Sequence, residues 1–452
     1  MKVIKSIKGF KDIKSSNFGL SENQLREKAH ALIPGGAHTY SRGDDQFPEN
    51  APALVVKGKG CYIWGSNGEK YLDYGMGLRT VTIGYATPEI DNAAIAEIRK
   101  GTNLTKSSLT ELDAAEKVLK LFKGMDMVKF AKNGSTVTTA AVKLARAYTD
   151  RKYILRCIDH PFFSYDDWFI GDTVVKKGIP EEISSLTINF KFNDIESVKQ
   201  AFRNYPNQIA CVIMEPTTHI QPENGFLKEV ADITHKNGAV FISDEISCTF
   251  RTGIFTTLDQ YGVTPDLVTV GKGMANGYPL TALVGKKEIM NLGGIKKEGE
   301  ERVFLISTTY GGELISLGAI QAVIDYYKKH DVLNYLWSYN KKFISGINKI
   351  SSDIGIEDKF YIEGFPGRMN YVAKDNSGKS SFEFRTLFHQ EMVKNKILIP
   401  WIVNSYAHGD KELKMTFDAV TNSLEVYKKA LKAGLGHYLK GKPQKPVFRQ
   451  FN

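Results

Sequence analysis

Three short apolar runs in the middle of the chain constrain its fold more than any other feature. They occupy residues 210–214, 239–243 and 267–270, and each is rich in β-branched or other apolar residues. The first two flank residues 227–234, where apolar side chains recur at helical spacing, and Asn237-Gly238 then forms a typical helix stop. Strands that alternate with helices favour a parallel sheet covered on both faces, so the sequence predicts an α/β fold.

Polar residues stand at the end of each of these runs. Glu215 and Asp244 directly follow the first two, and Lys272 lies just beyond the third. Ligands of open parallel sheets bind beyond the carboxyl ends of the strands, so we expect these side chains to share one site. A lysine and an aspartate placed in this way suit a cofactor with an aldehyde and a ring nitrogen, which is pyridoxal phosphate.

Each of these two residues also has a simpler explanation. The predicted role of Lys272 is a Schiff base with the aldehyde, whereas an isolated Gly-Lys-Gly is more typical of a surface lysine. Asp244 is predicted to hold the pyridine nitrogen protonated, but it could also be a turn aspartate, with Glu245 and Arg251 forming a structural ion pair. The presence of both residues favours the cofactor.

Three further segments fit the same cofactor. Asn133, Gly134 and Ser135 precede a helical pattern over residues 137–148, and a helix N-terminus favours a phosphate, although a plain helix cap explains them equally well. Phe162 follows an apolar run at 153–157 and could stack on the pyridine ring, unless it belongs to the core. The hydroxyl-rich turn at 307–312 could supply further phosphate donors or simply be a capped loop.

Composition and charge argue against several classes of protein. The net charge of +10 is spread along the chain. The densest runs of basic residues, at 2–14 and 440–449, are interpreted as solvated chain ends. No basic face with interleaved aromatic residues suggests a nucleic-acid partner. No apolar run approaches the roughly 18 residues of a membrane span, and no signal peptide is evident. The four cysteines form no C-x-x-C pair, so no metal site is expected. We therefore expect a cytoplasmic protein with reduced thiols.

The texture of the chain suggests three segments. Residues 1–75 contain a hairpin-like stretch at 53–64 that turns at Ser66-Asn-Gly68, and 76–325 form a large cofactor-binding domain. Residues 326–452 are predicted to form a small α+β domain with a short strand near 397–400 and a helix over 410–433.

The chain resembles the class III, fold-type I pyridoxal-phosphate aminotransferases, and most of all the glutamate-1-semialdehyde 2,1-aminomutase branch. The resemblance spans about residues 25–435. It rests on Ile33-Pro-Gly-Gly36, Tyr71-Leu-Asp-Tyr74, Asn133-Gly-Ser135 with Leu144-Ala-Arg146, Glu215-Pro216, Asp244-Glu245 with Phe250-Arg251, and Pro265-Asp266 through Gly271-Lys272. It implies the fold of that family: a large domain with a mainly parallel central sheet covered by helices, and a smaller α+β domain built from both chain ends.

The resemblance also implies roles for individual residues. Lys272 matches the lysine bound to the cofactor, Asp244 the pyridinium partner, and Gly134 with Ser135 the phosphate loop. Phe162 stands where the family usually has a stacking tyrosine. Thr308 matches a threonine that reaches the phosphate of the neighbouring subunit, which implies a homodimer with shared active sites.

Departures from the family leave cofactor handling intact but alter the substrate pocket. Arg42 matches the arginine that grips the substrate carboxylate in the aminomutase, but Gly77-Leu78 replaces its Ser-Trp pair, and Arg79 adds a cation. We therefore expect an aminotransferase that moves an amino group from a glutamate-like donor to a carbonyl compound. An intramolecular aminomutase and a non-catalytic protein that kept the fold remain the alternatives.

Overall fold

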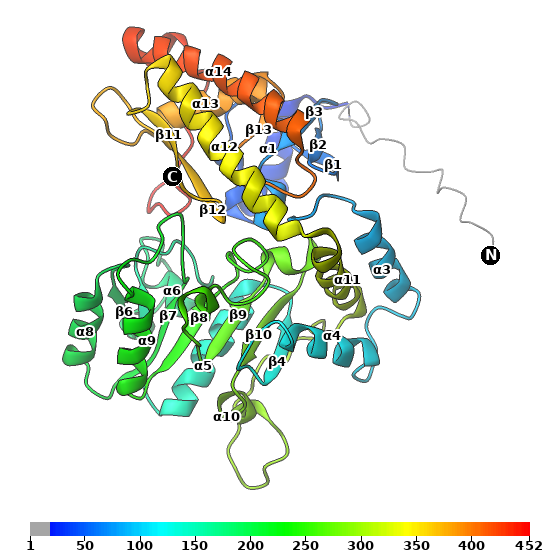
Figure 1. The fold of residues 1–452 in the computed structure, drawn as a ribbon, viewed down its shortest axis with the longest axis vertical. Helices are drawn as coiled ribbons and strands as arrows, with labels where there is room; N and C mark the ends of the chain where they lie inside the picture. Colours follow the sequence, from blue (N-terminus) through cyan, green and yellow to red (C-terminus); the bar gives the residue numbers. More distant parts are fainter. Residues whose placement is uncertain (1–18) are drawn as a thin grey trace.

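A seven-stranded sheet lies at the centre of the larger part of the molecule (Figure 1). The computed structural model describes residues 19–452, so the basic run at residues 2–14 lies outside the described residues. The strand order is β4-β10-β9-β8-β7-β5-β6, and β10 is antiparallel to both of its neighbours while the other pairings are parallel. The strands are β4 (Met127–Ala131), β5 (Tyr153–Cys157), β6 (Thr187–Phe190), β7 (Ile209–Met214), β8 (Val240–Asp244), β9 (Leu267–Val270) and β10 (Thr281–Gly285).

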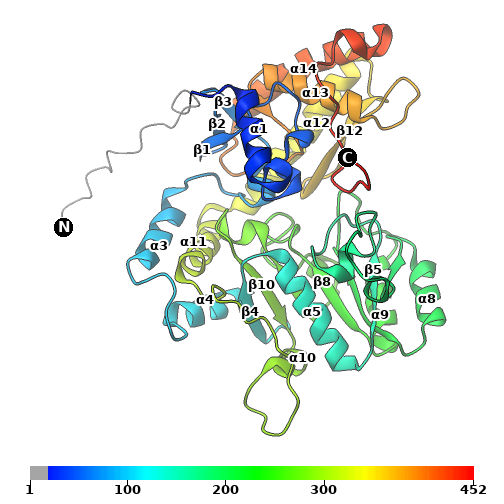
Figure 2. The same ribbon diagram turned by 180° about the vertical axis from the view of Figure 1, so that it is seen from behind.

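Helices cover both faces of this sheet, as its continuous apolar strands require. Figure 2 shows α5 (Gly134–Thr149) across one face, and α8 (Ile195–Asn204) and α9 (Phe226–Lys236) pack on the other. Near β4, α3 (Pro88–Ile98), α4 (Leu109–Leu119) and α11 (Leu314–His330) form a second layer. The short helices α6 (Asp167–Ile170), α7 (Glu181–Ser184) and α10 (Lys287–Met290) complete this part. The predicted strands and the helices around residues 227–234 and 137–148 are confirmed.

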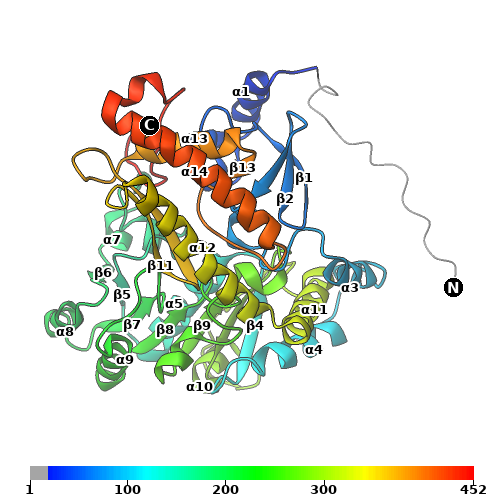
Figure 3. The same cartoon turned by 45° about the horizontal axis from the view of Figure 1, so that its top comes forward.

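Both ends of the chain build the smaller part, which Figure 3 shows from above. Its sheet has the order β1-β2-β3-β13, in which β13 pairs in parallel with β3. The elements are α1 (Glu22–Leu32), β1 (Val55–Lys59), β2 (Tyr62–Gly65), β3 (Lys70–Asp73), α12 (Val332–Ile354), the hairpin of β11 (Phe360–Phe365) and β12 (Arg368–Ala373), α13 (Phe382–Lys394), β13 (Ile397–Leu398) and α14 (Asp410–Ala433). These elements share an apolar core that joins Leu72 to Leu424. The fold is therefore the predicted α/β fold with a smaller sheet from the chain ends.

The N-terminal hairpin differs from the prediction in one respect. Two turns are present: one at Gly60-Cys61 between β1 and β2, and one at residues 66–69 between β2 and β3. Gly60 has φ of 61°, which favours glycine and allows the earlier turn. The boundaries at residues 75 and 325 stay a prediction.

Three further properties of residues 19–452 bear on function. No helix among them is both long and apolar enough to cross a membrane. No three side chains of the histidine, cysteine, aspartate or glutamate type come together there in a way that could bind a metal ion. The four cysteines are buried and free of disulfides, as expected.

Candidate functional site

Lys272 lies just beyond the end of β9, half-buried, with a left-handed backbone (φ 45°). Its Nζ donates a hydrogen bond to the Ser247 Oγ at 2.6 Å. Burial lowers the pKa of Lys272 to about 8; the negative charge of Glu215 opposes this shift and the positive charge of Arg79 adds to it. The amine therefore exists partly in its neutral, nucleophilic form near neutral pH.

Asp244 is the last residue of the neighbouring strand β8 and is buried. Its Oδ1 accepts hydrogen bonds from the Ile246 N–H (3.1 Å) and the Thr269 hydroxyl (3.0 Å), whereas no hydrogen bond from residues 19–452 reaches Oδ2. Burial, helped by the negative charge of Glu215, raises the pKa of Asp244 to about 7. A positively charged partner at Oδ2 would stabilise the carboxylate.

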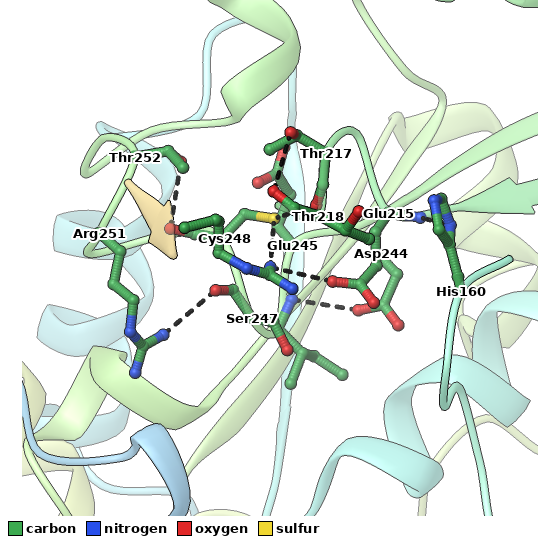
Figure 4. A network of polar contacts seen from close by, with 12 residues as sticks. His160, Glu215, Thr217, Thr218, Asp244, Glu245, Ser247, Cys248, Arg251 and Thr252 are labelled. Carbon is green, nitrogen blue, oxygen red and sulfur yellow. Dashed lines mark hydrogen bonds and ion pairs between the residues drawn. The ribbon is translucent and has the colours of Figure 1, made fainter. Parts of the chain in front are cut away.

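Glu215 follows β7 and completes the row of polar groups at the carboxyl edge of the sheet (Figure 4). Its Oε2 pairs with the Arg368 Nη1 at 3.0 Å, and its N–H donates to the Nδ1 of His160 at 3.0 Å. The ring of His160 is buried and its Nε2 has no hydrogen-bond partner within the described chain. Burial lowers the pKa of His160 to about 4, so the ring is neutral at physiological pH.

The N-terminus of α5 lies close to this row. Asn133 caps the helix, its Oδ1 accepting from the Thr136 N–H at 3.0 Å, so the predicted helix cap is present. A Cβ on Gly134 would lie only 2.9 Å from the Cδ1 of Ile246, whose N–H binds Asp244. The buried hydroxyl of Ser135 accepts from the Tyr165 N–H at 3.0 Å. Since the first N–H groups of a helix have no partner within it, this terminus can also hold a phosphate.

Phe162 and Thr308 do not join this cluster within one chain. Phe162 is 45% exposed and packs edge-on against Phe169, with ring centroids 5.6 Å apart, and also against Phe448 near the C-terminus. Thr308 lies in an exposed loop that precedes α11. The structure brings Lys272, Asp244 and Glu215 to one edge, with residues 133–135 beside them.

The sequence also allowed two purely structural ion pairs, of Arg42 with Asp44 or Asp45 and of Arg251 with Glu245, and neither is present among the described residues. Arg42 is exposed, and neither nearby aspartate pairs with it, because Asp44 binds His30 and Asp45 binds Arg449. The alternative in which Glu245 and Arg251 form a structural ion pair is not what the described residues show. Glu245 is buried and accepts instead from the backbone N–H and hydroxyl of Thr257, at 2.6 and 2.7 Å.

Arg79 belongs to an unusual left-handed turn between β3 and α3. The four residues from Met76 to Arg79 have φ values of 39°, 58°, 62° and 70°. Asp73 holds the turn by accepting from the N–H groups of Gly75 (2.7 Å) and Met76 (3.0 Å). Left-handed backbone costs roughly 1–2 kcal/mol for each residue other than glycine, so this turn is strained.

His160 and Arg368 are the site residues that the sequence did not reveal. The position of His160 just after a predicted strand could have drawn attention to it. Arg368 lies 153 residues from Glu215, and no local pattern connects the two.

The groups at this edge fit pyridoxal phosphate. They comprise an amine whose pKa is lowered toward neutrality, a buried carboxylate with one oxygen unpaired within the described chain, and a helix N-terminus beside them. These are the chemical partners that the aldehyde, the ring nitrogen and the phosphate of the cofactor require.

Comparisons with known proteins agree with this fit. The profile of the family "Aminotransferase class-III" matches residues 44–358. The chain is 30% identical over 419 residues to the 3-aminobutyryl-CoA aminotransferase of Cloacimonas acidaminovorans (strain Evry), covering 90% of this chain and 97% of the relative.

Solved structures share the fold. The FumI protein of Sphingopyxis sp. MTA144 matches with a TM-score of 0.83 at 23% identity, over 91% of this chain and 97% of that one. A glutamate-1-semialdehyde-aminomutase from Pseudomonas aeruginosa PAO1 matches with a TM-score of 0.78 at 17% identity, over 89% of this chain and 94% of that one.

Proposed function

Because this chain belongs to the class-III aminotransferases, enzymes that use pyridoxal phosphate, we propose that it moves an amino group from a glutamate-like donor to a carbonyl acceptor through Lys272. The single observation that supports this role for Lys272 is the pairing of β8 with β9. That pairing places Asp244 and the partly neutral amine of Lys272 at the same edge of the sheet.

Pyridoxal phosphate supplies an aldehyde that accepts amino groups and a ring that withdraws electrons from the carbon that carries them. The Nζ of Lys272 would hold the aldehyde and, as a free amine, would serve as the base that moves the proton of the substrate carbon. The carboxylate of Asp244 would keep the ring nitrogen protonated. The N-terminus of α5, with Asn133, Gly134 and Ser135, would hold the phosphate.

Phe162 and Glu215 have proposed places around the same ring. Glu215 is fixed by Arg368, so it lines the site as a charge whose position does not vary. Phe162 would cover a face of the ring after a shift of its exposed side chain.

A homodimer with shared sites is part of this proposal. The loop at residues 307–310 is exposed in the single chain, and Thr308 is proposed to bind the phosphate of the partner subunit's cofactor. Large apolar side chains are exposed on the same part of the molecule, including Leu109 (79%), Phe304 (65%) and Tyr310 (62%). Exposed apolar surface of this kind is typical of a subunit interface.

Transfer between two molecules is preferred over an intramolecular aminomutase reaction for two reasons. The 30% identical relative is an aminotransferase. In addition, the strained turn of Gly77-Leu78-Arg79 replaces the Ser-Trp pair of the aminomutase branch. Such a turn would give the pocket a different shape and an added positive charge.

The test is a panel of donors and acceptors that includes glutamate and 3-aminobutyryl-CoA, with the cofactor absorbance followed after each donor is added. Glutamate should convert the bound cofactor and release 2-oxoglutarate, and an acceptor should reverse the change. An aminomutase would instead convert glutamate 1-semialdehyde without releasing a keto acid. Lys272→Ala should remove turnover, while the exposed Lys287→Ala should match the wild type. Full turnover by Lys272→Ala would contradict the proposal.

A further inference from the structure

Three arginines from distant parts of the chain line one pocket beside Lys272. Arg79 comes from the left-handed turn, Arg251 from the segment after β8, and Arg368 from the start of β12. Asn340 and Asn404 are also in the wall of this pocket, which opens to solvent. Ser247 connects the pocket with Lys272, since its hydroxyl accepts from the Lys272 Nζ and its carbonyl accepts from the Arg251 Nη1 at 3.2 Å.

The positive charge of this pocket is not balanced. Among residues 19–452 the three guanidinium groups form one ion pair, that of Arg368 with Glu215, so three charges minus one leave two uncompensated. Asp244 does not pair with Arg79 or Arg251, and Glu245 is engaged by Thr257. Burial, together with the repulsion between these guanidinium groups, lowers the pKa of Arg251 to about 9 and the pKa of Arg79 to about 10.

Arg251 provides an independent observation that points to a ligand in this pocket. It is only 9% exposed, yet its Nε and Nη2 are buried without hydrogen-bond partners in the described chain. Buried guanidinium donors without partners are unfavourable, and an anion in the pocket would satisfy them.

Asn404 adds an unpaired hydrogen-bond acceptor to the unpaired donors of Arg251. Its Nδ2 donates to the Asn340 Oδ1 at 2.6 Å, and Asn340 in turn donates to the Pro366 carbonyl. This chain of bonds fixes the orientation of the amide and leaves the buried Asn404 Oδ1 without a donor. A ligand that carries a hydroxyl as well as negative charge would use both kinds of group.

We propose that Arg79, Arg251 and Arg368 form a subsite for a phosphate or phosphonate group on the amino substrate. Two uncompensated positive charges match a dianion, whereas a single carboxylate would neutralise one of them. Guanidinium groups that converge from three elements suit a tetrahedral group with several terminal oxygens better than a planar carboxylate with two. The inference rests on the proposed function, in which the substrate amine reacts at Lys272.

The first measurement is calorimetric binding of inorganic phosphate to the enzyme loaded with pyridoxal phosphate, so that the cofactor occupies its own phosphate site. Phosphate should bind more tightly than acetate. Arg79→Gln and Arg251→Gln should each weaken phosphate binding about tenfold or more, as expected for a lost charged hydrogen bond. Arg203→Gln makes the same change on the outer helix α8 and should leave binding unchanged.

The second measurement compares two amino donors of equal length, β-alanine and 2-aminoethylphosphonate, in the half-reaction with the bound cofactor. The phosphonate should have the lower KM, and Arg79→Gln should remove that preference. Succinate, a dianion with two planar carboxylates, is titrated as a further control. The proposal would be overturned if phosphate bound no more tightly than acetate or succinate. It would also be overturned if phosphate binding survived both arginine variants. Phosphate binding that depends on the arginines, with no donor converting the cofactor, would support the subsite and reject the aminotransfer proposal instead.

Discussion

The carboxylate of Glu215 and the guanidinium of Arg368 form a buried ion pair of 3.0 Å between the carboxyl end of β7 and the first residue of β12. The pair joins the large sheet to the hairpin of the smaller part, so both halves of the molecule contribute to the site. Breaking a buried pair leaves one charge uncompensated and is strongly destabilising. The pair therefore fixes the position of Arg368 in the pocket, while Arg79 and Arg251 have no ion pair within the described chain.

Asp244→Asn should cost far more activity than Glu245→Gln. Only Asp244 is proposed to hold a proton on the cofactor ring, whereas Glu245 binds Thr257 and Ser243 within the fold. Glu245→Gln should mainly lower the melting temperature, because the donors of Thr257 and Ser243 lose a charged acceptor. Steady-state kinetics and thermal unfolding of both variants test this. Similar losses of activity in the two would mean that the ring does not lie at Asp244.

The contribution of Lys272 to the stability of the protein without cofactor should change with pH between about 8 and 10.5. Its pKa is about 8 when folded and 10.5 when exposed, so between these values the unfolded chain binds more protons than the folded one. Stability conferred by this group therefore rises with pH through that window. Lys272→Met should be more stable than the wild type at pH 7, and the difference should shrink by pH 10. A difference that does not change with pH in denaturant titrations would show that the pKa is not lowered.

Thr308→Ala should weaken the binding of pyridoxal phosphate by about tenfold, the value of one charged hydrogen bond. Cofactor affinity should also fall when the protein is diluted below its dimerisation constant, because in the proposed shared site this hydroxyl comes from the partner subunit. Sedimentation and cofactor titration measure both effects. A fully active monomer at the working concentration is the outcome that contradicts shared sites.

Arg42→Ala should raise the KM for a glutamate-like donor roughly tenfold and leave the melting temperature unchanged, because this exposed arginine has no ion pair with Asp44 or Asp45. Arg203→Ala serves as the control. Unchanged kinetics with reduced thermal stability would assign Arg42 a structural role.

Arg79→Gly should stabilise the protein by about 1 kcal/mol while it weakens anion binding, since glycine adopts the left-handed conformation without strain. Arg79→Gln keeps the strain and isolates the effect of the charge. Chemical denaturation of both variants separates the two contributions. A glycine variant less stable than the glutamine variant would mean that the turn is not strained.

The sequence predicted the features that depend on local pattern. The apolar runs before Glu215, Asp244 and Lys272 identified their strands, and strand order then brought the three residues together. The arginine pocket could not be predicted in this way, because Arg79, Arg251 and Arg368 are joined only by packing. The turn at Arg79 was also hidden, since three of its four residues are not glycine. Phe162 was singled out for its position after β5, while His160, two residues earlier, is the residue that contacts Glu215.

The pairing of β13 with β3 has a consequence for biosynthesis. A ribosome that has released β10 has already supplied every strand of the seven-stranded sheet, together with Lys272, Asp244 and the N-terminus of α5. The sheet of the chain ends must wait until residue 398 emerges, and Arg368 also comes late. The cofactor-binding edge can therefore form first during translation, and the arginine pocket is the last part of the site to be assembled.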